Sequence, residues 1–219
     1  MIQTPDESAR SRAYVWTRER ILDGTFPSGK MISEGEVSSS VGVSRTPVRE
    51  AFLRLESEGM LDLFPKRGAL VVPITSLDMR NVMEARLLIE PWAAAIAARL
   101  VDRRSIVGTL ESRIAAIRNA HLPSELLRYQ EEDRSFHETI VAVTGNDIVA
   151  NFYRSLRDRQ LRMGAAALIT IQGRPATILA EHQQIVDAIA EGDVNLAVMS
   201  VQSHIAHTRD ALELELRMA

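Results

Sequence analysis

The stretch GVSRTPVREAFLRLESEGM, residues 42–60, decides how the first part of the chain folds. Its apolar residues recur at the spacing of one helix face and are Val48, Ala51, Phe52 and Leu55. Arg45, Thr46 and Arg49 lie off that face. Pro47 fits a first helical turn, because amides there have no intrahelical acceptor. The pattern predicts an amphipathic helix with a basic, polar N-terminal end.

Two interpretations of this polar end are open. Free amides, a hydroxyl and two arginines suit contacts with DNA phosphates and base edges, and arginine can bind guanine bidentately. An ordinary solvated helix face would carry similar residues. The preceding segments favour the first interpretation. A helix pattern covers residues 7–23, and another opens at SEGEVSSSV, where Ser33 and Glu36 have capping-box spacing.

The segment that follows the helix reads as a β-hairpin. The short strand patterns LDLF and ALVV flank PKRG, which places Lys66, Arg67 and Gly68 at the tip. A basic tip of this kind suits contact with a neighbouring minor groove or phosphate. The predicted order of elements is that of a winged helix: a helix, a short helix, a turn, a third helix and a basic hairpin.

The whole segment ILDGTFPSGKMISEGEVSSSVGVSRTPVREAFLRLESEGMLDLFPKRGALV closely resembles the winged-helix domain of the GntR family of bacterial transcription regulators. The resemblance implies binding to double-stranded operator DNA by a homodimer. It assigns recognition-helix contacts to Arg45, Thr46 and Arg49, and wing contacts to Lys66, Arg67 and Gly68. Gly35 is a departure, because family members often carry a basic residue there, so the operator preference is expected to differ.

Composition narrows the class of protein. The chain has 219 residues, 46% of them hydrophobic, no cysteine and a formal net charge of −3. This charge does not suggest a general nucleic-acid coat, and the lack of cysteine excludes disulfides and thiolate metal sites. We find no signal-peptide pattern and no apolar run near the roughly 18–20 residues of a membrane span. We therefore expect a cytoplasmic protein.

The pattern changes near VVPITSLD, residues 71–78, after which only helix patterns follow. They cover residues 77–101, 104–119, 124–143, 147–167, 176–191 and 194–216. Pro91 predicts a kink or break in the first of them. The sequence thus predicts a mostly α protein: a winged helix-turn-helix with a small β-hairpin in residues 1–73, and an all-helical bundle in residues 74–219.

Asp133 and His137 lie four residues apart in DRSFHETI, so both occupy one helix face. His182 and His204 lie on or beside apolar stripes of two later helices. One carboxylate and three imidazoles inside a bundle would suit a divalent metal. Ordinary core or surface histidines are the other interpretation, because this spacing is common in helices.

The segments EEDRSFHETIVAVTGN, LAEHQQIVDAIAEGD and AVMSVQSHIAHTRDAL resemble the FadR C-terminal domain, the helical effector domain of one GntR subfamily. Many members bind a metal through one Asp and three His. The resemblance implies that Asp133, His137, His182 and His204 bind a divalent metal ion, zinc first, with nickel, manganese or cobalt as alternatives. It leaves out His121 and His207.

We expect the metal to present positive charge to a small organic acid in an otherwise apolar cavity. Arg86 is a candidate effector-binding residue, because the resemblance places an arginine there in many relatives, although an ion pair with Glu90 would also explain it. Arg157 is a second candidate, because Phe152 and Leu156 mark the buried side nearby.

The preferred hypothesis is a DNA-binding transcription regulator, a repressor, whose operator affinity is controlled by a small carboxylate bound at the metal. No membrane partner and no catalytic residue are expected. One alternative is the same regulator with a purely structural metal. Another is a helical metalloenzyme, for which the sequence offers no dedicated general base.

Overall fold

The computed structural model describes residues 8–156, 159–163, 168 and 171–218. Contacts within the chain divide it into two compact units, Met1–Ile74 and Thr75–Ala219. Each unit has a hydrophobic core of its own. No helix in the described part of the chain is both long and apolar enough to cross a bilayer.

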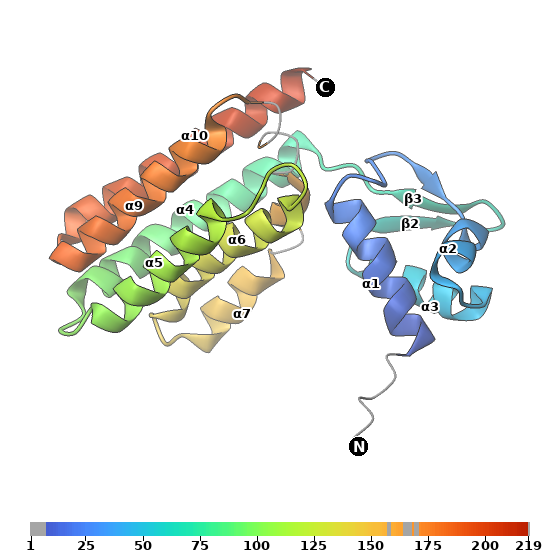
Figure 1. Cartoon of the computed structure of the whole chain (residues 1–219), viewed down its shortest axis with the longest axis horizontal. Coiled ribbons are helices and arrows are strands. Elements are labelled where there is room, and N and C mark those ends of the chain that lie inside the picture. Colours follow the sequence, from blue (N-terminus) through green and yellow to red (C-terminus); the bar gives the residue numbers. More distant parts are fainter. Residues whose placement is uncertain (1–7, 157–158, 164–167, 169–170, 219) are drawn as a thin grey trace. The chain divides into compact units, whose positions relative to one another are not determined.

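The N-terminal unit is a winged helix, as the sequence predicts (Figure 1). Its elements are α1 (Ala9–Leu22), β1 (Met31–Ile32), α2 (Glu34–Val41), α3 (Arg45–Ser57), β2 (Leu61–Phe64) and β3 (Gly68–Val71). The sheet has the order β1-β3-β2, and both outer strands pair antiparallel with β3. The sequence does not predict β1, because a strand of two residues carries no alternation pattern.

Local chemistry sets the turn between α2 and α3. Ser33 caps α2, because its Oγ accepts a hydrogen bond from the Glu36 amide at 3.0 Å. Gly42 ends the helix in the left-handed region at φ 70°, where glycine carries no steric penalty. The predicted apolar face of α3 is buried and consists of Val48, Ala51, Phe52 and Leu55.

Gly68, the first residue of β3 directly after the wing turn, has a structural reason to be glycine. Its φ is +106°, and a Cβ atom there would lie 2.3 Å from the carbonyl oxygen of Ile32 in β1. Only a residue without a side chain permits this approach of β3 to β1. At the tip itself, Lys66 also has a positive φ, 63°.

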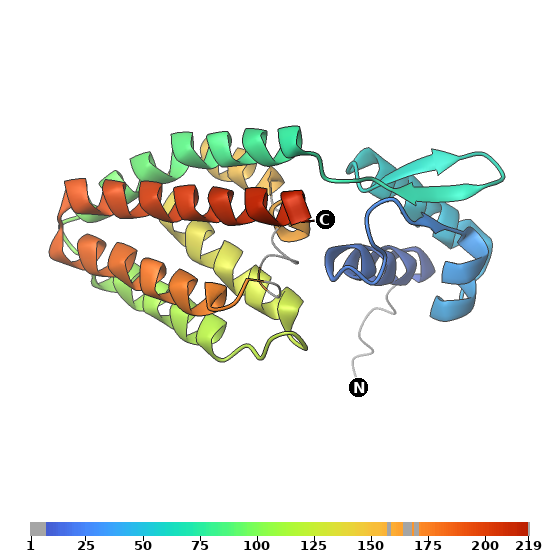
Figure 2. The ribbon, with the colours of Figure 1, turned by 90° about the horizontal axis from the view of Figure 1, so that it is seen from above.

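The C-terminal unit is all-helical in its described residues. Its helices are α4 (Ser76–Arg99), α5 (Arg104–Arg118), α6 (Leu126–Ala142), α7 (Asp147–Ser155), α9 (Arg174–Glu191) and α10 (Val194–Met218). Figure 2 shows α10 in red lying along α9 in orange, and α10 also packs along α4. Helix α5 packs against α6 and α9. This arrangement brings α4, α6, α9 and α10 around a shared interior.

Two helix predictions hold only in part. At Pro91 the expected break is absent, because α4 continues across this residue to Arg99. Pro91 is buried, and α4 packs along α10. The predicted helix over residues 147–167 is interrupted: α7 ends at Ser155, with Leu156 as its C-cap, and residues 159–163 are helical again.

Candidate metal centre and nucleic-acid interface

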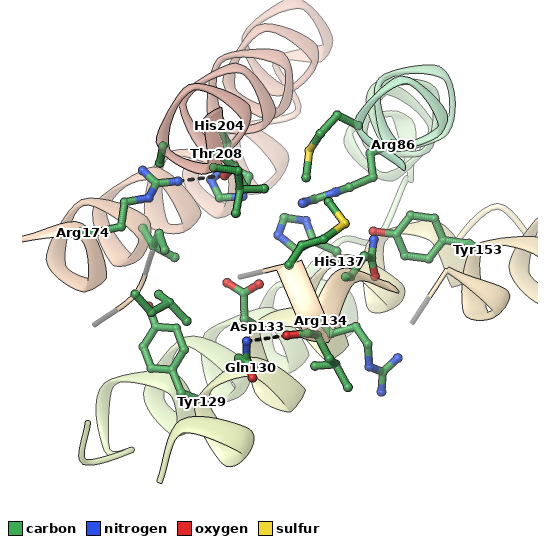
Figure 3. A pocket seen from close by; sticks show the side chains of 18 residues that line it. Arg86, Tyr129, Gln130, Asp133, Arg134, His137, Tyr153, Arg174, His204 and Thr208 are labelled. Carbon is green, nitrogen blue, oxygen red and sulfur yellow. Dashed lines mark hydrogen bonds between the residues drawn. The ribbon is translucent and has the colours of Figure 1, made fainter. Parts of the chain in front are cut away.

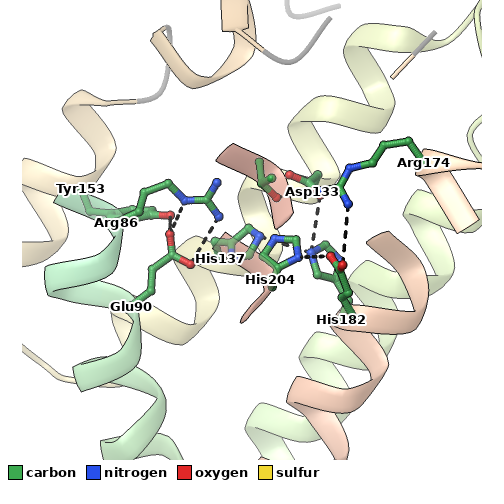
Figure 4. Close-up of polar contacts among 10 residues, drawn as sticks. Arg86, Glu90, Asp133, His137, Tyr153, Arg174, His182 and His204 are labelled. Atoms are coloured by element: carbon green, nitrogen blue, oxygen red, sulfur yellow. Dashed lines mark hydrogen bonds and ion pairs between the residues drawn. The ribbon is translucent and has the colours of Figure 1, made fainter. Parts of the chain in front are cut away.

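The structure brings the four candidate metal ligands together from three helices (Figure 4). Asp133 and His137 lie on α6, His182 on α9 and His204 on α10. Each of the three histidines has at most 2% of its surface exposed. The ring nitrogens that these histidines offer lie within 4.8 Å of one another.

The spacing of the donor atoms fits one metal ion. The Nε2 atoms of His137 and His182 are 3.3 Å apart, and His182 Nε2 lies 3.6 Å from Asp133 Oδ1. Two nitrogens bound to one tetrahedral zinc at about 2.0–2.1 Å would lie about 3.3–3.4 Å apart. The distance between His137 and His182 therefore matches a tetrahedral shell, the ring nitrogens of all three histidines lie within a wider limit of 4.8 Å, and Asp133 approaches the group through His182.

Glu90 on α4 is a buried carboxylate that orients His137. Its Oε2 lies 2.9 Å from His137 Nδ1, which leaves Nε2 facing His182. Its Oε1 accepts hydrogen bonds from Arg86 Nε at 2.5 Å and from Tyr153 Oη at 2.7 Å. Burial alone would raise the pKa of Glu90, but Arg86 and His137 hold it well below its usual range.

Glu181 on α9 is the carboxylate that orients His204. Its Oε2 lies 2.8 Å from His204 Nδ1, which leaves Nε2 of that ring free to face the cluster. Its Oε1 lies 2.7 Å from Nδ1 of the half-exposed His207. His207 therefore contacts the partner of a candidate ligand but is not in the cluster itself.

The interior of the bundle favours the neutral form of two of the clustered imidazoles, His182 and His204. Burial lowers the pKa of His182 well below its usual range, and the neighbouring His204 and His137 lower it further. Burial likewise lowers the pKa of His204, followed by the effects of His137 and Arg86. A neutral imidazole is the form that binds metals, because its ring nitrogen has a free lone pair.

Asp133 is the one carboxylate of the set, and it faces a cavity. About 29% of its side-chain surface remains accessible, although it lies inside the bundle. Burial raises its pKa, whereas His137 and Arg86 lower it. The side chain is thus positioned to bind a cation that also contacts the imidazoles.

The cavity beside the cluster has a volume of about 80 Å³ (Figure 3). A single water needs about 10–15 Å³ on this measure, so the cavity has room for a small organic molecule. Asp133, His137 and His204 line it, whereas His182 is not among the lining residues. A metal bound by all four would therefore have one side towards the cavity.

The structure describes only one of the two candidate effector-binding arginines. Arg86 lines the cavity, but its Nε is bonded to Glu90, so the ion pair is present. An effector role for Arg86 stays a prediction, because the pair leaves part of its guanidinium facing the cavity. Arg157 lies outside the described residues.

Sequence reasoning missed several polar residues of this site. They are Glu181, Arg174, Thr208 and Tyr129. Burial raises the pKa of Tyr129, the charge of Asp133 raises it further and Arg174 lowers it, so its hydroxyl lies near both charged groups. The sequence does contain a signal for such residues, because a polar residue within a mainly apolar helix face indicates a polar site inside the bundle.

The candidate DNA-contacting side chains are exposed on the N-terminal unit. Arg45, Thr46 and Arg49 are at the start of α3, and Lys66 and Arg67 form the wing tip. A separate feature is that Arg49 Nε donates to Glu34 Oε1 at 3.0 Å, which holds its guanidinium against α2. The Nη2 atom of Arg45 lies 3.6 Å from where a Cβ atom at Gly35 would be, an ordinary van der Waals distance.

Comparison with known families decides the classification. Residues 10–71 match the profile described as "Bacterial regulatory proteins, gntR family", and residues 81–207 match that of the "FCD domain". The chain belongs to the GntR family. Within that family it carries the FCD type of helical domain, the FadR C-terminal type that its sequence resembles.

Relatives of this GntR-family chain are transcription regulators. It is 30% identical to an HTH-type transcriptional regulator in an unstable DNA locus of Streptomyces ambofaciens, over 97% of this chain and 89% of the relative. It is 26% identical to the gluconate operon transcriptional repressor of Bacillus subtilis, over 90% and 82%. The GntR-family chain is thus a DNA-binding transcription regulator and not an enzyme, so the metalloenzyme alternative is excluded.

A solved structure shares the fold. The structure titled "E. coli McbR/YncC" matches with a TM-score of 0.75 at 17% identity, covering 95% of this chain and 99% of that one. Identity this low shows the fold alone. The fold of this GntR-family chain is therefore a winged helix followed by a helical FCD domain.

Proposed function

We propose that this regulator is a repressor whose affinity for operator DNA is controlled by a small carboxylate bound at a metal in the FCD domain. The metal ligands are Asp133, His137, His182 and His204, and the metal is divalent, zinc first. The protein acts as a homodimer, with one α3 recognition helix in each half of a roughly palindromic operator.

One observation carries the metal part of the proposal. Three buried imidazoles converge with a carboxylate at the wall of a cavity, and burial lowers the pKa of two of them, His182 and His204. Without a cation, the Nε2 atoms of His137 and His182 would share at most one proton across 3.3 Å. Nickel, manganese and cobalt accept the same ligands, so the donor set alone does not select among them.

The bound metal would supply a positive charge to an anion that enters the cavity. The surrounding side chains shape the site. Glu90 and Glu181 orient two of the imidazoles, and apolar residues exclude water. Burying a carboxylate in such a cavity would be costly without a cationic partner. This requirement favours an acid as the effector.

On the DNA side, Arg45, Thr46 and Arg49 are the proposed recognition-helix contacts, and Lys66 and Arg67 the proposed wing contacts. All five side chains are exposed. Gly68 shapes the wing, and its backbone can contact DNA there. A repressor role is supported by relatives whose names describe repressors, such as that of the gluconate operon in Bacillus subtilis.

Elemental analysis of protein purified without a His-tag or chelator tests this proposal. We expect about one divalent metal ion per chain, and its loss in His182→Ala. The control is His121→Ala, which removes an exposed histidine outside the cluster and should leave metal content unchanged. Absence of metal after incubation with zinc, nickel, manganese or cobalt would refute the site.

A second candidate function keeps the regulator but makes the metal purely structural. The observation that favours it is the depth of His182, which has no exposed surface. Under this alternative, removal of the metal lowers thermal stability, but added carboxylates leave operator affinity unchanged in the metal-loaded protein. Under our proposal, carboxylates change that affinity.

A further inference from the structure

The cavity has a second polar wall, formed by Arg174 on the side away from Arg86 (Figure 3). Arg174 is the first residue of α9, and only 7% of its surface is exposed. Its Nη2 donates to Thr208 Oγ1 on α10 at 2.8 Å, and its Nη1 lies 3.7 Å from Glu181 Oε1. The guanidinium is thus fixed between two helices at the edge of the cavity.

The guanidinium of Arg174 retains donors for a ligand. Glu181 is already engaged by His204 at 2.8 Å and His207 at 2.7 Å, so its 3.7 Å contact with Arg174 is the longest of the three. A guanidinium has five N–H donors, and these two contacts occupy at most a few of them. Arg174 lines the cavity, where the remaining donors meet whatever binds there.

Tyr129 adds an unused hydroxyl to the same cavity. It is 2% exposed, and within the described part of the chain its Oη has no hydrogen-bond partner. A buried hydroxyl without a partner is costly, and a ligand that bonds to it would remove that cost. The unpartnered hydroxyl indicates that the ligand itself carries a polar group at this position.

The charges around the cavity, with a divalent metal bound, sum to about one positive charge, which a single negative charge on the ligand would balance. A divalent metal and Asp133 sum to +1, because the metal-bound imidazoles are neutral. Arg86 pairs with Glu90, and Arg174 faces Glu181, so each of these cations has a carboxylate beside it. At the rim, Arg134 is flanked by two carboxylates, Glu131 and Glu138, so that group adds no net positive charge.

We infer that the effector is a hydroxylated acid with a single carboxylate, and that Arg174, Thr208 and Tyr129 select it. The carboxylate neutralises the metal site, and the hydroxyls bond to Arg174 and Tyr129 across the cavity. A dicarboxylate would leave a buried excess negative charge, and an unsubstituted acid would leave the Tyr129 hydroxyl unpaired. The inference rests on the proposed metal site.

Four acids of three carbons test this selection on the zinc-loaded, full-length protein. Propanoate has one carboxylate, lactate adds one hydroxyl, glycerate adds two, and malonate has a second carboxylate. Calorimetry should give glycerate a dissociation constant at least about tenfold below that of propanoate, with lactate between them. Malonate should bind more weakly than lactate.

Two variants assign the selection to residues. Tyr129→Phe should weaken glycerate binding about tenfold, leave propanoate binding unchanged and retain the zinc. Tyr14→Phe is the matched control, because it removes a tyrosine hydroxyl from the N-terminal unit. Arg174→Gln should reduce the preference for glycerate over propanoate. If Arg174 instead bound a second carboxylate, this variant would mainly weaken malonate.

The outcomes separate this inference from the proposed function. If the protein holds zinc but malonate binds most tightly, or the four acids bind equally or not at all, the inference is wrong and the metal site stands. An unchanged preference in Tyr129→Phe would also overturn it. If the protein holds no metal, the inference and the proposed metal site fail together.

Discussion

Two carboxylates outside the proposed metal set fix the orientation of two histidines inside it. Glu90 contacts Nδ1 of His137, and Glu181 contacts Nδ1 of His204, so both rings present Nε2 to the cluster. Such partners hold a ligand in one tautomer and raise its basicity. The cluster is therefore arranged before any metal binds.

Replacing Glu90 should damage both stability and metal binding. Glu90→Gln leaves the buried Arg86 guanidinium without its charged partner, which should cost about 3–5 kcal/mol of unfolding free energy in urea. It should also weaken zinc binding about 10–100-fold, measured by competition with a chelator. Glu84→Gln, an exposed change on the same helix, is the control and should alter neither. Wild-type zinc affinity in Glu90→Gln would contradict the orienting role.

Gly68→Ala tests the close approach of the wing to β1. The new Cβ would lie 2.3 Å from the Ile32 carbonyl oxygen at a positive φ, so we expect a loss of roughly 2 kcal/mol or more in the stability of the winged helix. Gly24→Ala has φ +80° but no atom within 4 Å, and should cost only about 1 kcal/mol. Equal losses in thermal unfolding would show that the contact with Ile32 is unimportant.

At the scale of elements, caps and apolar stripes explain which helices the sequence predicts well. The face of α3 and the Ser33 cap of α2 are local patterns, and both are present. The end of α7 at Ser155 was not predictable, because apolar spacing continues beyond it through Leu156 and Leu161. The C-cap residue Leu156 is neither glycine nor asparagine, and no proline follows it closely, so no local signal marks this end.

The capping box at the start of α4 allows a test with pH. Thr75 Oγ1 accepts from the Asp78 amide at 3.1 Å, and Asp78 Oδ2 accepts from the Thr75 amide at 3.0 Å. Hydrogen bonds from the Thr75 side chain and backbone lower the pKa of Asp78. Thr75→Ala should therefore cost about 1 kcal/mol at neutral pH.

The sign of the pH dependence follows from that lowered pKa. The contribution of Asp78 is present above its unfolded pKa, about 3.9, and is lost as the pH falls through the lower folded value. The cost of Thr75→Ala in urea unfolding should thus shrink in acid. Ser8→Ala removes a cap bonded to the Ser11 amide with no carboxylate involved, so its cost should be independent of pH in that range. A constant cost for both variants would contradict the role of Asp78.

At the scale of the whole molecule, the proposed DNA contacts and the proposed metal site reside in separate compact units. Arg49→Ala should therefore abolish specific operator binding in an anisotropy assay while leaving metal content at the wild-type level. Its side chain is 70% exposed and supports no core, so stability should change little. Arg118→Ala, in the helical domain, is a control of the same type. Retained operator affinity in Arg49→Ala would refute its assignment to recognition.

How far the sequence predicts the site depends on which residues act through tertiary contacts. Asp133 and His137 are readable as a pair because one helix face carries both, and the family resemblance adds His182 and His204. Glu181 directly precedes His182, yet its bond to His204 depends on how α9 packs against α10. The same holds for Arg174 and Thr208, which meet only across that packing.

The central claim is that an acid bound at the metal site controls operator affinity. The direct measurement is the operator dissociation constant, by anisotropy on a duplex selected from random DNA, with and without glycerate, for zinc-loaded protein, metal-free protein and His182→Ala. We predict that glycerate weakens operator binding about 5–150-fold in the zinc-loaded protein, and not in the other two. An equal effect in all three, or none in the zinc-loaded protein, would contradict the account.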